Sequence, residues 1–234
     1  MFYFLKKKVV VDCFVNHPTI AEHYSIQKSI KLTPDWWKKL ESFYTRSDNL
    51  AGISVRQNTM KTCPGFVDLY RSSWTIPLWM DIFLRTSEEG SYTYLTPCDM
   101  GFQAVSSHDV KQHGDNFQNF IQLKLTSPWL LFEKRGVQFA FLGNDWELLK
   151  KHPEVKSLPG VVNFKSNHST NFNMFLPKVN AEYNFLAGLP LVQIIPLTDH
   201  KVEFRAHSVT DSEYQEVMKR ANIVKVSFDL KNRS

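Results

Sequence analysis

Apolar residues recur with a period of two through most of the chain that follows Pro77, and this pattern constrains the fold more than any other feature of the sequence. Alternation of this kind predicts short β-strands that bury one face. Strands and helices do not alternate regularly, so a doubly wound parallel sheet is not favoured. The predicted strands are 8–15, 78–86, 92–96, 120–126, 129–133, 137–142, 161–164, 172–176, 191–197, 202–207 and 224–230.

The turns between these strands favour an antiparallel arrangement. Residues 87–91 (SEEGS) are typical of a hairpin loop, and Lys134-Arg135-Gly136 indicates a second turn. We therefore predict a mainly β protein with an antiparallel β-sandwich or jelly-roll-like core and a few short helices at its margins. Gly and Pro are spread evenly and no linker-like stretch interrupts the chain, so we expect residues 1–234 to form a single domain.

Three segments carry helix signals instead. Thr33 is a suitable cap for the first helix, which would bury Trp36 and Phe43 on one face. Thr210 and Glu213 fit a capping box, in which each side chain bonds to the backbone of the other residue. The predicted helices are 34–44, 64–73 and 210–221.

The composition is that of a globular protein, because 43% of the 234 residues are hydrophobic and 22% are charged. Such a chain can bury enough surface to fold, which excludes intrinsic disorder. No apolar run reaches the ~18 residues of a membrane span. The first apolar block precedes the basic run Lys6–Lys8, the reverse of the order in a secretory signal. We expect neither secretion nor a membrane partner.

The net charge of +5 is too small to argue for nucleic-acid binding. The basic runs Lys6–Lys8, Lys38–Lys39 and Lys150–Lys151 are short and far apart, and nucleic-acid affinity depends on neutralising many phosphates together. We interpret these runs as solvated edges and expect no nucleic-acid partner. The tryptophans in periodic apolar patterns, which we assign to the core, are Trp36, Trp74, Trp79 and Trp129.

Common catalytic signatures are missing from the sequence. It contains no G-x-x-x-x-G-K-[ST], no G-x-G-x-x-G and no G-x-S-x-G. Its three cysteines, Cys13, Cys63 and Cys98, have no short spacing, which favours reduced and mostly buried thiols. Cys63 could be a nucleophile at a helix start, where a thiol pKa is lowered, but no base lies near it in the sequence, so we favour a structural role.

The sharpest metal-like pattern is His113-Gly114-Asp115. Jelly-roll Fe(II)/2-oxoglutarate oxygenases use two histidines and one carboxylate on one face of the iron. In that alternative His113, Asp115 and His200 hold Fe(II), with His168 or His207 as other choices for the third ligand, and Arg205 pairs with the 2-oxoglutarate.

Chance accounts for this pattern equally well. Asp and Glu make up 23 of 234 residues, so eight histidines should produce about one accidental His-x-acid pair, and the chain has two, at His113 and His152. The surrounding sequence HDVKQHGDNFQN is typical of a polar loop. We therefore assign no catalytic, cofactor-binding or metal-binding residue.

Four stretches together point to a family. They are PDWWKKL at 34–40, CPGFVDLYRSSWTIPLWMD at 63–81, LPGVVNF at 158–164 and AGLPLVQIIPL at 187–197. With them the chain resembles a family of uncharacterised proteins of tailed phages, notably phages of marine bacteria, and of some bacteria. The resemblance spans about 9–205. The family has no assigned activity, so the resemblance implies a viral setting and no site residues.

The same stretches also serve as architecture, because each combines Pro or Gly with large apolar residues. Gln193 lies within the apolar run 191–195. It is either a hydrogen-bonded amide of the core, which we favour, or a residue that binds a ligand in a pocket.

For function we expect a non-enzymatic phage-type protein, either a virion component or an accessory binding module. Its partners would be other phage proteins or further copies of itself, in the virion or in the host cytoplasm. The alternatives are the Fe(II)/2-oxoglutarate oxygenase described above and a β protein that binds a small molecule in an aromatic interior.

Overall fold

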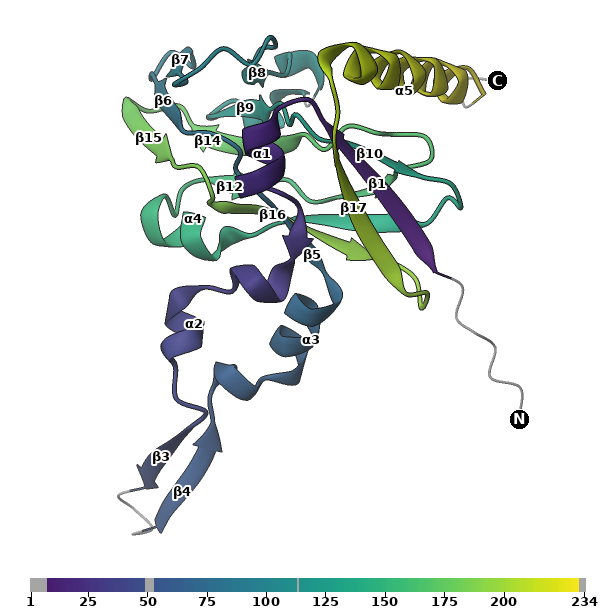
Figure 1. Cartoon of the computed structure of the whole chain (residues 1–234). Helices are drawn as coiled ribbons and strands as arrows, with labels where there is room; N and C mark the ends of the chain where they lie inside the picture. The colour runs from purple at the N-terminus through teal and green to yellow at the C-terminus, as the bar shows by residue number, and fades with distance from the viewer. Residues whose placement is uncertain (1–7, 49–52, 113, 232–234) are drawn as a thin grey trace, which may run out of the picture.

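A computed structural model of the chain describes residues 8–48, 53–112 and 114–231 (Figure 1). Most of the strands form a body, and a narrow arm extends from it. The long C-terminal helix α5 (Asp211–Lys231) lies across the end of the body that is opposite the arm. The predicted mainly β architecture with a sandwich-like core and few helices is confirmed.

The body contains four sheets, and nearly all neighbouring strands are antiparallel. The exception is the parallel pair β1–β17, in which Val9 lies opposite Val202 and Val15 opposite Ser208. The first sheet has the order β10 (Leu130–Glu133), β1 (Val9–Val15), β17 (Val202–Ser208), and the second has the order β13 (Gly160–Asn163), β11 (Gln138–Gly143), β16 (Pro190–Pro196), β5 (Trp74–Pro77), β2 (Gln27–Lys28). The third sheet has the order β12 (Lys156–Ser157), β14 (Phe172–Pro177), β9 (Phe120–Leu125), β8 (Val105–Ser107). The fourth has the order β15 (Ala181–Phe185), β6 (Ile82–Thr86), β7 (Tyr92–Leu95).

Alternating burial along these strands builds the core. In β1 every second residue from Val9 to Val15 is buried, and in β6 Ile82, Leu84 and Thr86 are buried between exposed neighbours. One large cluster of buried residues contains side chains from all four sheets of the body. Of the tryptophans expected in the core, Trp74, Trp79 and Trp129 are buried, whereas Trp36 is only partly buried.

The arm is inserted between two paired strands. β2 and β5 are antiparallel neighbours, with Gln27 opposite Thr75 and Lys28 opposite Trp74. The chain leaves the sheet after β2 and returns at β5, and the residues between them, 29–73, form the arm (Figure 1). Its elements are η1 (Ser29–Leu32), α2 (Asp35–Lys39), β3 (Phe43–Asp48), β4 (Ile53–Asn58), η2 (Met60–Thr62) and α3 (Pro64–Ser72).

Buried polar side chains close the neck of the arm. The hydroxyls of Ser29 and Thr75 are 2.7 Å apart, and Ser73 Oγ donates to Ser29 Oγ at 2.8 Å. Gln193 is buried and its amide donates to Ser73 Oγ at 3.5 Å. Gln193 is thus a core amide, as favoured above, and it links β16 to the base of the arm.

The first predicted helix is much shorter than expected. α2 ends at Lys39, and Phe43, which was assigned to the same helix, begins strand β3. The helix has Pro34 rather than Thr33 at its cap position, and Thr33 Oγ1 instead donates to the carbonyl of Ile30. The β-rich sequence after Phe43 pairs with β4, which overrides the helical spacing.

The other two predicted helices are present in the structure. α3 covers the predicted segment, although Trp74, which we placed on its apolar stripe, belongs to β5. α5 starts at the predicted capping box, where Thr210 N donates to Glu213 Oε2 at 2.8 Å and Glu213 N to Thr210 Oγ1 at 3.4 Å. The helix continues through the strand predicted at 224–230, so that strand is wrong.

Several elements, and the pairing of one pair of strands, were not predicted from the sequence. The sequence analysis did not identify α1 (Pro18–His23), α4 (Asp145–Lys151), the β3–β4 hairpin or β15. The Lys134-Arg135-Gly136 turn is present, but it joins strands of two different sheets, because β10 pairs with β1 and β11 with β13 and β16. Two short helices, η3 (Val110–Gln112) and η4 (Gly114–Phe117), fill the connection between β8 and β9.

Candidate functional site

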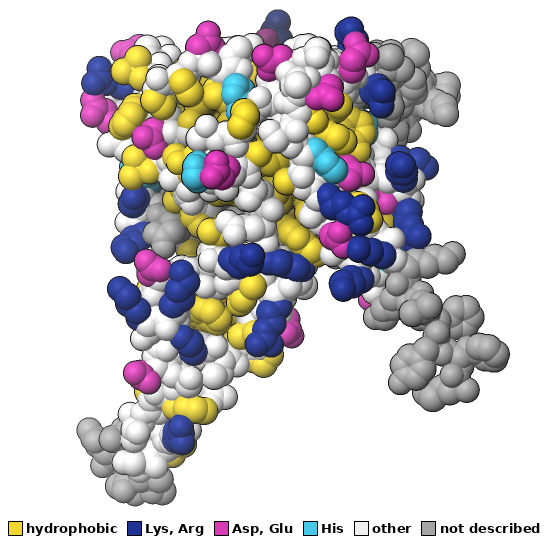
Figure 2. Space-filling view, viewed as in Figure 1, with side chains coloured by type: hydrophobic (Ala, Val, Ile, Leu, Met, Phe, Trp, Pro, Cys, Tyr) yellow, Lys and Arg dark blue, Asp and Glu magenta, His cyan; other side chains and the backbone are white. Residues whose placement is uncertain are grey.

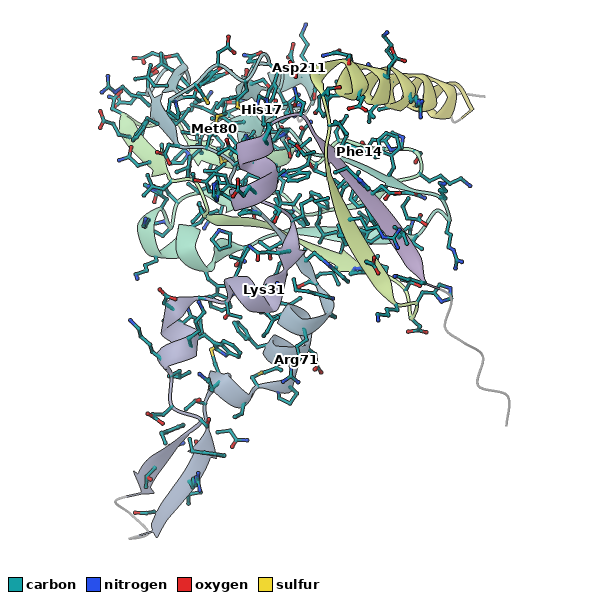
Figure 3. All side chains as sticks on the ribbon, viewed as in Figure 1. Phe14, His17, Lys31, Arg71, Met80 and Asp211 are labelled. Carbon is teal, nitrogen blue, oxygen red and sulfur yellow. The ribbon has the colours of Figure 1, made fainter. Side chains whose placement is uncertain are left out.

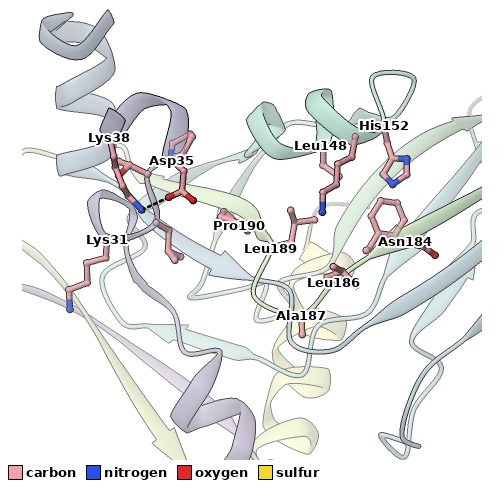
Figure 4. Close-up of a pocket in the computed structure, with 15 residues that line it drawn as sticks. Lys31, Asp35, Lys38, Leu148, His152, Asn184, Leu186, Ala187, Leu189 and Pro190 are labelled. Carbon is pink, nitrogen blue, oxygen red and sulfur yellow. Dashed lines mark hydrogen bonds and ion pairs between the residues drawn. The ribbon is translucent and has the colours of Figure 1, made fainter. Parts of the chain in front are cut away.

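A groove of about 330 Å³ lies where the arm meets the body, and we call it the junction groove (Figure 4). One wall belongs to the arm, from η1 to α2. The other wall comes from α4 and from the segment that joins β15 to β16. The lining residues are Lys31, Leu32, Thr33, Pro34, Asp35 and Lys38 of the arm, and Leu148, Lys151, His152, Asn184, Phe185, Leu186, Ala187, Leu189 and Pro190 of the body.

Contacts within the arm hold its wall in place. The indole of Trp37 donates to the carbonyl of Met60 at 3.0 Å, which ties α2 to η2. Lys61 Nζ donates to the carbonyls of Trp37 and Lys38, at the C-terminal end of α2. The Trp37 carbonyl also accepts from Leu40 N at 3.3 Å. A lysine is suited to this end of the helix, where the helix dipole is negative.

An aromatic cluster fixes the arm to the body. Tyr70 of α3 is buried, and its hydroxyl donates to Asn144 Oδ1, just before α4, at 3.3 Å. The ring of Trp146 in α4 lies 5.4 Å from Trp36 and 5.5 Å from Phe66, measured between ring centroids. Because the arm and α4 supply opposite walls, these contacts set the width of the junction groove.

The groove is rich in positive charge. Lys31, Lys38 and Lys151 line it, and Asp35 is the one carboxylate among its described lining residues. Lys38 Nζ lies 3.1 Å from Asp35 Oδ1. This hydrogen bond and the charge of Lys38, with smaller effects of Lys39 and Lys150, lower the pKa of Asp35. Figure 2 shows Lys and Arg side chains on this part of the surface.

The arm contributes most of the net charge of the chain. Residues 29–73 contain seven Lys or Arg against four Asp or Glu, which is a net charge of +3 out of +5 for the whole chain. Lys28, at the neck, lies over the ring of Trp74 at 3.2 Å from its centroid. The positive potential of the groove is therefore part of a wider basic surface.

The floor of the groove is apolar. Leu148 and Phe185 are buried, and Leu189 and Pro190 are half-buried beside them. The His152 ring packs against Phe185 with ring centroids 5.5 Å apart. Cations above an apolar floor can bind a carboxylate or phosphate group together with the carbon atoms that carry it.

Two of the lysine runs come close together at the junction groove. All four lysines are exposed, as expected of solvated edges, but Lys38 and Lys151 line opposite walls of the groove. Lys39 and Lys150 add smaller effects on the pKa of Asp35. The signal in the sequence was the presence of two similar basic pairs. Nothing in the sequence shows that these two pairs face each other.

The residues of the oxygenase alternative are not brought together in the described structure. His113 lies outside the described residues, and so does the side chain of Asp115. Asp115 belongs to η4, at the α5 end of the body, while exposed His200 lies in the turn that precedes β17 at the opposite end (Figure 1). In the described part of the chain, no three His, Cys, Asp or Glu side chains gather as a metal site would require.

The other residues considered for that alternative have structural partners. His168 is buried, and its Nδ1 lies 2.9 Å from the carbonyl oxygen of Leu131. His207 Nε2 lies 2.9 Å from Asp12 Oδ1. Arg205 is ion-paired with Glu203 at 2.8 Å. Each of these three side chains therefore has a partner within the protein.

The cysteines differ from expectation in their exposure. All three are free thiols, but only Cys13 is buried, and Cys63 and Cys98 are exposed. Burial raises the pKa of the Cys13 thiol well above its ordinary value. Cys98 Sγ lies 3.8 Å from Met100 Sδ.

No protein-family model matches the chain, and no curated protein matches it significantly. Within the described residues, no helix is both long and apolar enough to span a membrane.

Proposed function

We propose that the chain is a non-enzymatic phage-type protein, a virion or assembly component or an accessory binding module, that holds an acidic segment of another phage protein in its junction groove. The observation that carries the proposal is the placement of Lys31, Lys38 and Lys151 around one groove with a single described carboxylate, Asp35. The viral setting rests on the sequence resemblance given above.

Charge complementarity selects the partner. Carboxylates of Asp or Glu side chains match the lysines, and the apolar floor at Leu148 and Phe185 can bury the chain that carries them. A nucleic acid is less suited, because its affinity depends on a long track of phosphate contacts and on exposed rings for stacking. The groove offers three lysines, and the rings among its described lining residues are Phe185, which is buried, and His152, which packs against Phe185.

The arm also suits assembly. Its β3–β4 hairpin extends away from the body and exposes Phe43, Tyr44 and Val55 (Figure 1). Large apolar side chains exposed on a projecting element favour contact with another protein. The groove would then hold the acidic segment while the hairpin adds apolar contact.

A labelled deca-glutamate peptide tests this proposal by fluorescence anisotropy. We expect Lys31→Gln combined with Lys151→Gln to weaken binding about fivefold or more, the effect of losing ~1 kcal/mol. Lys165→Gln with Lys201→Gln is the matched control, since both residues are exposed outside the groove and the net charge changes equally. This pair should leave binding nearly unchanged.

Two results would overturn the proposal. One is equal loss of peptide binding in the groove variant and in its control, which would mean that net charge alone governs binding. The other is a short oligothymidylate that binds more tightly than the peptide and is weakened by the groove variant, which would assign the groove to nucleic acid.

A further inference from the structure

A second and larger cavity lies at the opposite end of the body from the arm. It has a volume of about 570 Å³ and is open to solvent. Its lining comes from the turn after β1, the 99–102 turn, the segment between β9 and β10, residues 169–171 and the start of α5. We call it the helix-end cavity. His17 and Asp211, from its first and last segments, lie close together at this end in Figure 3.

The charge of this cavity is opposite to that of the junction groove. Asp99 and Asp211 line it, and none of its described lining residues is Lys or Arg, although the chain as a whole is basic. Anionic ligands are therefore disfavoured. Apolar atoms are supplied by Met100, Phe102 and Met218.

Each of the two carboxylates accepts a hydrogen bond from the protein through one of its own oxygens. Asp211 Oδ1 accepts a hydrogen bond from Asn16 Nδ2 at 2.8 Å, and Asp99 Oδ1 accepts one from Gly101 N at 2.8 Å. In the described structure the Oδ2 atoms of these two residues have no hydrogen-bond partner. Each carboxylate is thus oriented by the protein and keeps an acceptor for a ligand.

Hydrogen bonds also position the neutral part of the wall. Ser127 N donates to Asn171 Oδ1 at 3.3 Å, and Tyr214, which is buried, donates its hydroxyl to the carbonyl of Pro128 at 2.7 Å. The last bond anchors the first turn of α5 to the segment between β9 and β10. Positioned polar groups around an apolar surface are the usual form of a small-molecule site.

From this arrangement we infer that the helix-end cavity binds a small organic cation, a protonated amine with an apolar carbon skeleton. The ammonium group lies against Asp99 and Asp211, and the carbon atoms lie against Met100, Phe102 and Met218. Ligand and wall then match in both charge and polarity. This inference gives the small-molecule alternative a location, and it does not depend on the junction groove.

Cadaverine and its diol analogue are matched probes, because hydroxyls replace both ammonium groups on the same carbon chain. We expect calorimetry to detect cadaverine binding and no binding of the diol. Asp99→Asn and Asp211→Asn should each weaken cadaverine binding about fivefold, the factor for ~1 kcal/mol. Asn keeps the Oδ1 acceptor for Gly101 N or for Asn16, so these variants remove charge and preserve the local hydrogen bond.

Methionine methyl signals in NMR spectra locate the bound amine. Met100 and Met218 line the cavity and should shift on titration with cadaverine, whereas Met60, exposed on the arm, should not. Asp68→Asn, on the exposed surface of α3, is the charge-matched control and should bind like the wild type.

The inference is overturned if cadaverine does not bind, if Asp99→Asn and Asp211→Asn bind it as tightly as Asp68→Asn does, or if the Met60 signal shifts instead of the signals of Met100 and Met218. Equal binding of the diol would also overturn it, because the cavity would then recognise hydroxyls rather than an amine.

Discussion

Tyr70 donates its hydroxyl to Asn144 Oδ1 at 3.3 Å, and this bond joins the arm to the body in a buried position. The Trp37 and Phe66 rings pack around Tyr70 with centroids 6.4 and 4.8 Å away. The arm is therefore docked against α4 through its own small core. The junction groove depends on that docking, since neither the arm nor α4 forms a groove alone.

Replacing Tyr70 with Phe should destabilise the protein by about 1–2 kcal/mol, because Asn144 then keeps a buried acceptor without this donor. Urea unfolding measures the change. Tyr44→Phe is the matched control, since Tyr44 is exposed and its hydroxyl bonds to Gln57 on the hairpin surface. If both variants lose the same stability, the contact between arm and body is not a significant source of stability.

A buried carboxylate supports the turn after β10. Glu133 accepts hydrogen bonds from the backbone N–H groups of Arg135, Gly136 and Val137, at 2.6, 2.6 and 2.9 Å. Glu133→Ala removes all three acceptors and should cost about 2–4 kcal/mol in thermal or urea unfolding. Glu182→Ala, which breaks an exposed ion pair with Arg85, should cost less than ~1 kcal/mol. A similar cost for the two variants would contradict this account of the turn.

Stability should fall in mild acid because of His168. Burial lowers the pKa of His168, against an opposing effect of the Leu131 and Phe164 carbonyls, and the ring stacks on Phe132 with centroids 3.9 Å apart. Below about pH 6.5 the His168 ring binds a proton in the unfolded chain, whereas its lowered pKa keeps the ring neutral to lower pH in the folded chain. The free energy of unfolding therefore decreases as the pH falls through this range, and above it His168 contributes no pH dependence.

The variant His168→Asn tests this assignment, because its amide can still donate to the Leu131 carbonyl. Urea unfolding at pH 7.5 and pH 5.5 should show a smaller loss of stability in His168→Asn than in the wild type. His23→Asn is the control at an exposed histidine. Equal losses in the wild type and in His168→Asn would remove His168 as the cause.

Sequence patterns predicted those elements of the fold that depend on residues close together in the chain. Alternation identified strands such as β9, because a strand that buries one face has a period of two. The capping box at Thr210 located the start of α5 correctly. The same method failed at 224–230, where an alternating sequence continues a helix that no Gly or Pro interrupts after Asp211.

Features that depend on distant contacts could not be predicted in this way. The parallel pairing of β1 with β17 joins residues almost 200 positions apart. The short α2 ends where the β3–β4 hairpin begins, and that hairpin is a tertiary alternative to the expected helical turn. Both candidate sites arise from such contacts, since each is lined by segments that are separate in the sequence and show no motif individually.

The central proposal is that the junction groove holds an acidic segment of a partner protein. Carbodiimide cross-linking tests it most directly, because the reagent joins lysine amines to carboxylates in direct contact. Applied to the cells or particles that contain this chain, with mass spectrometry of the products, it should join Lys31, Lys38 or Lys151 to Asp or Glu residues of one partner protein. The account is contradicted if these lysines form no more intermolecular cross-links than exposed Lys165 and Lys201 do.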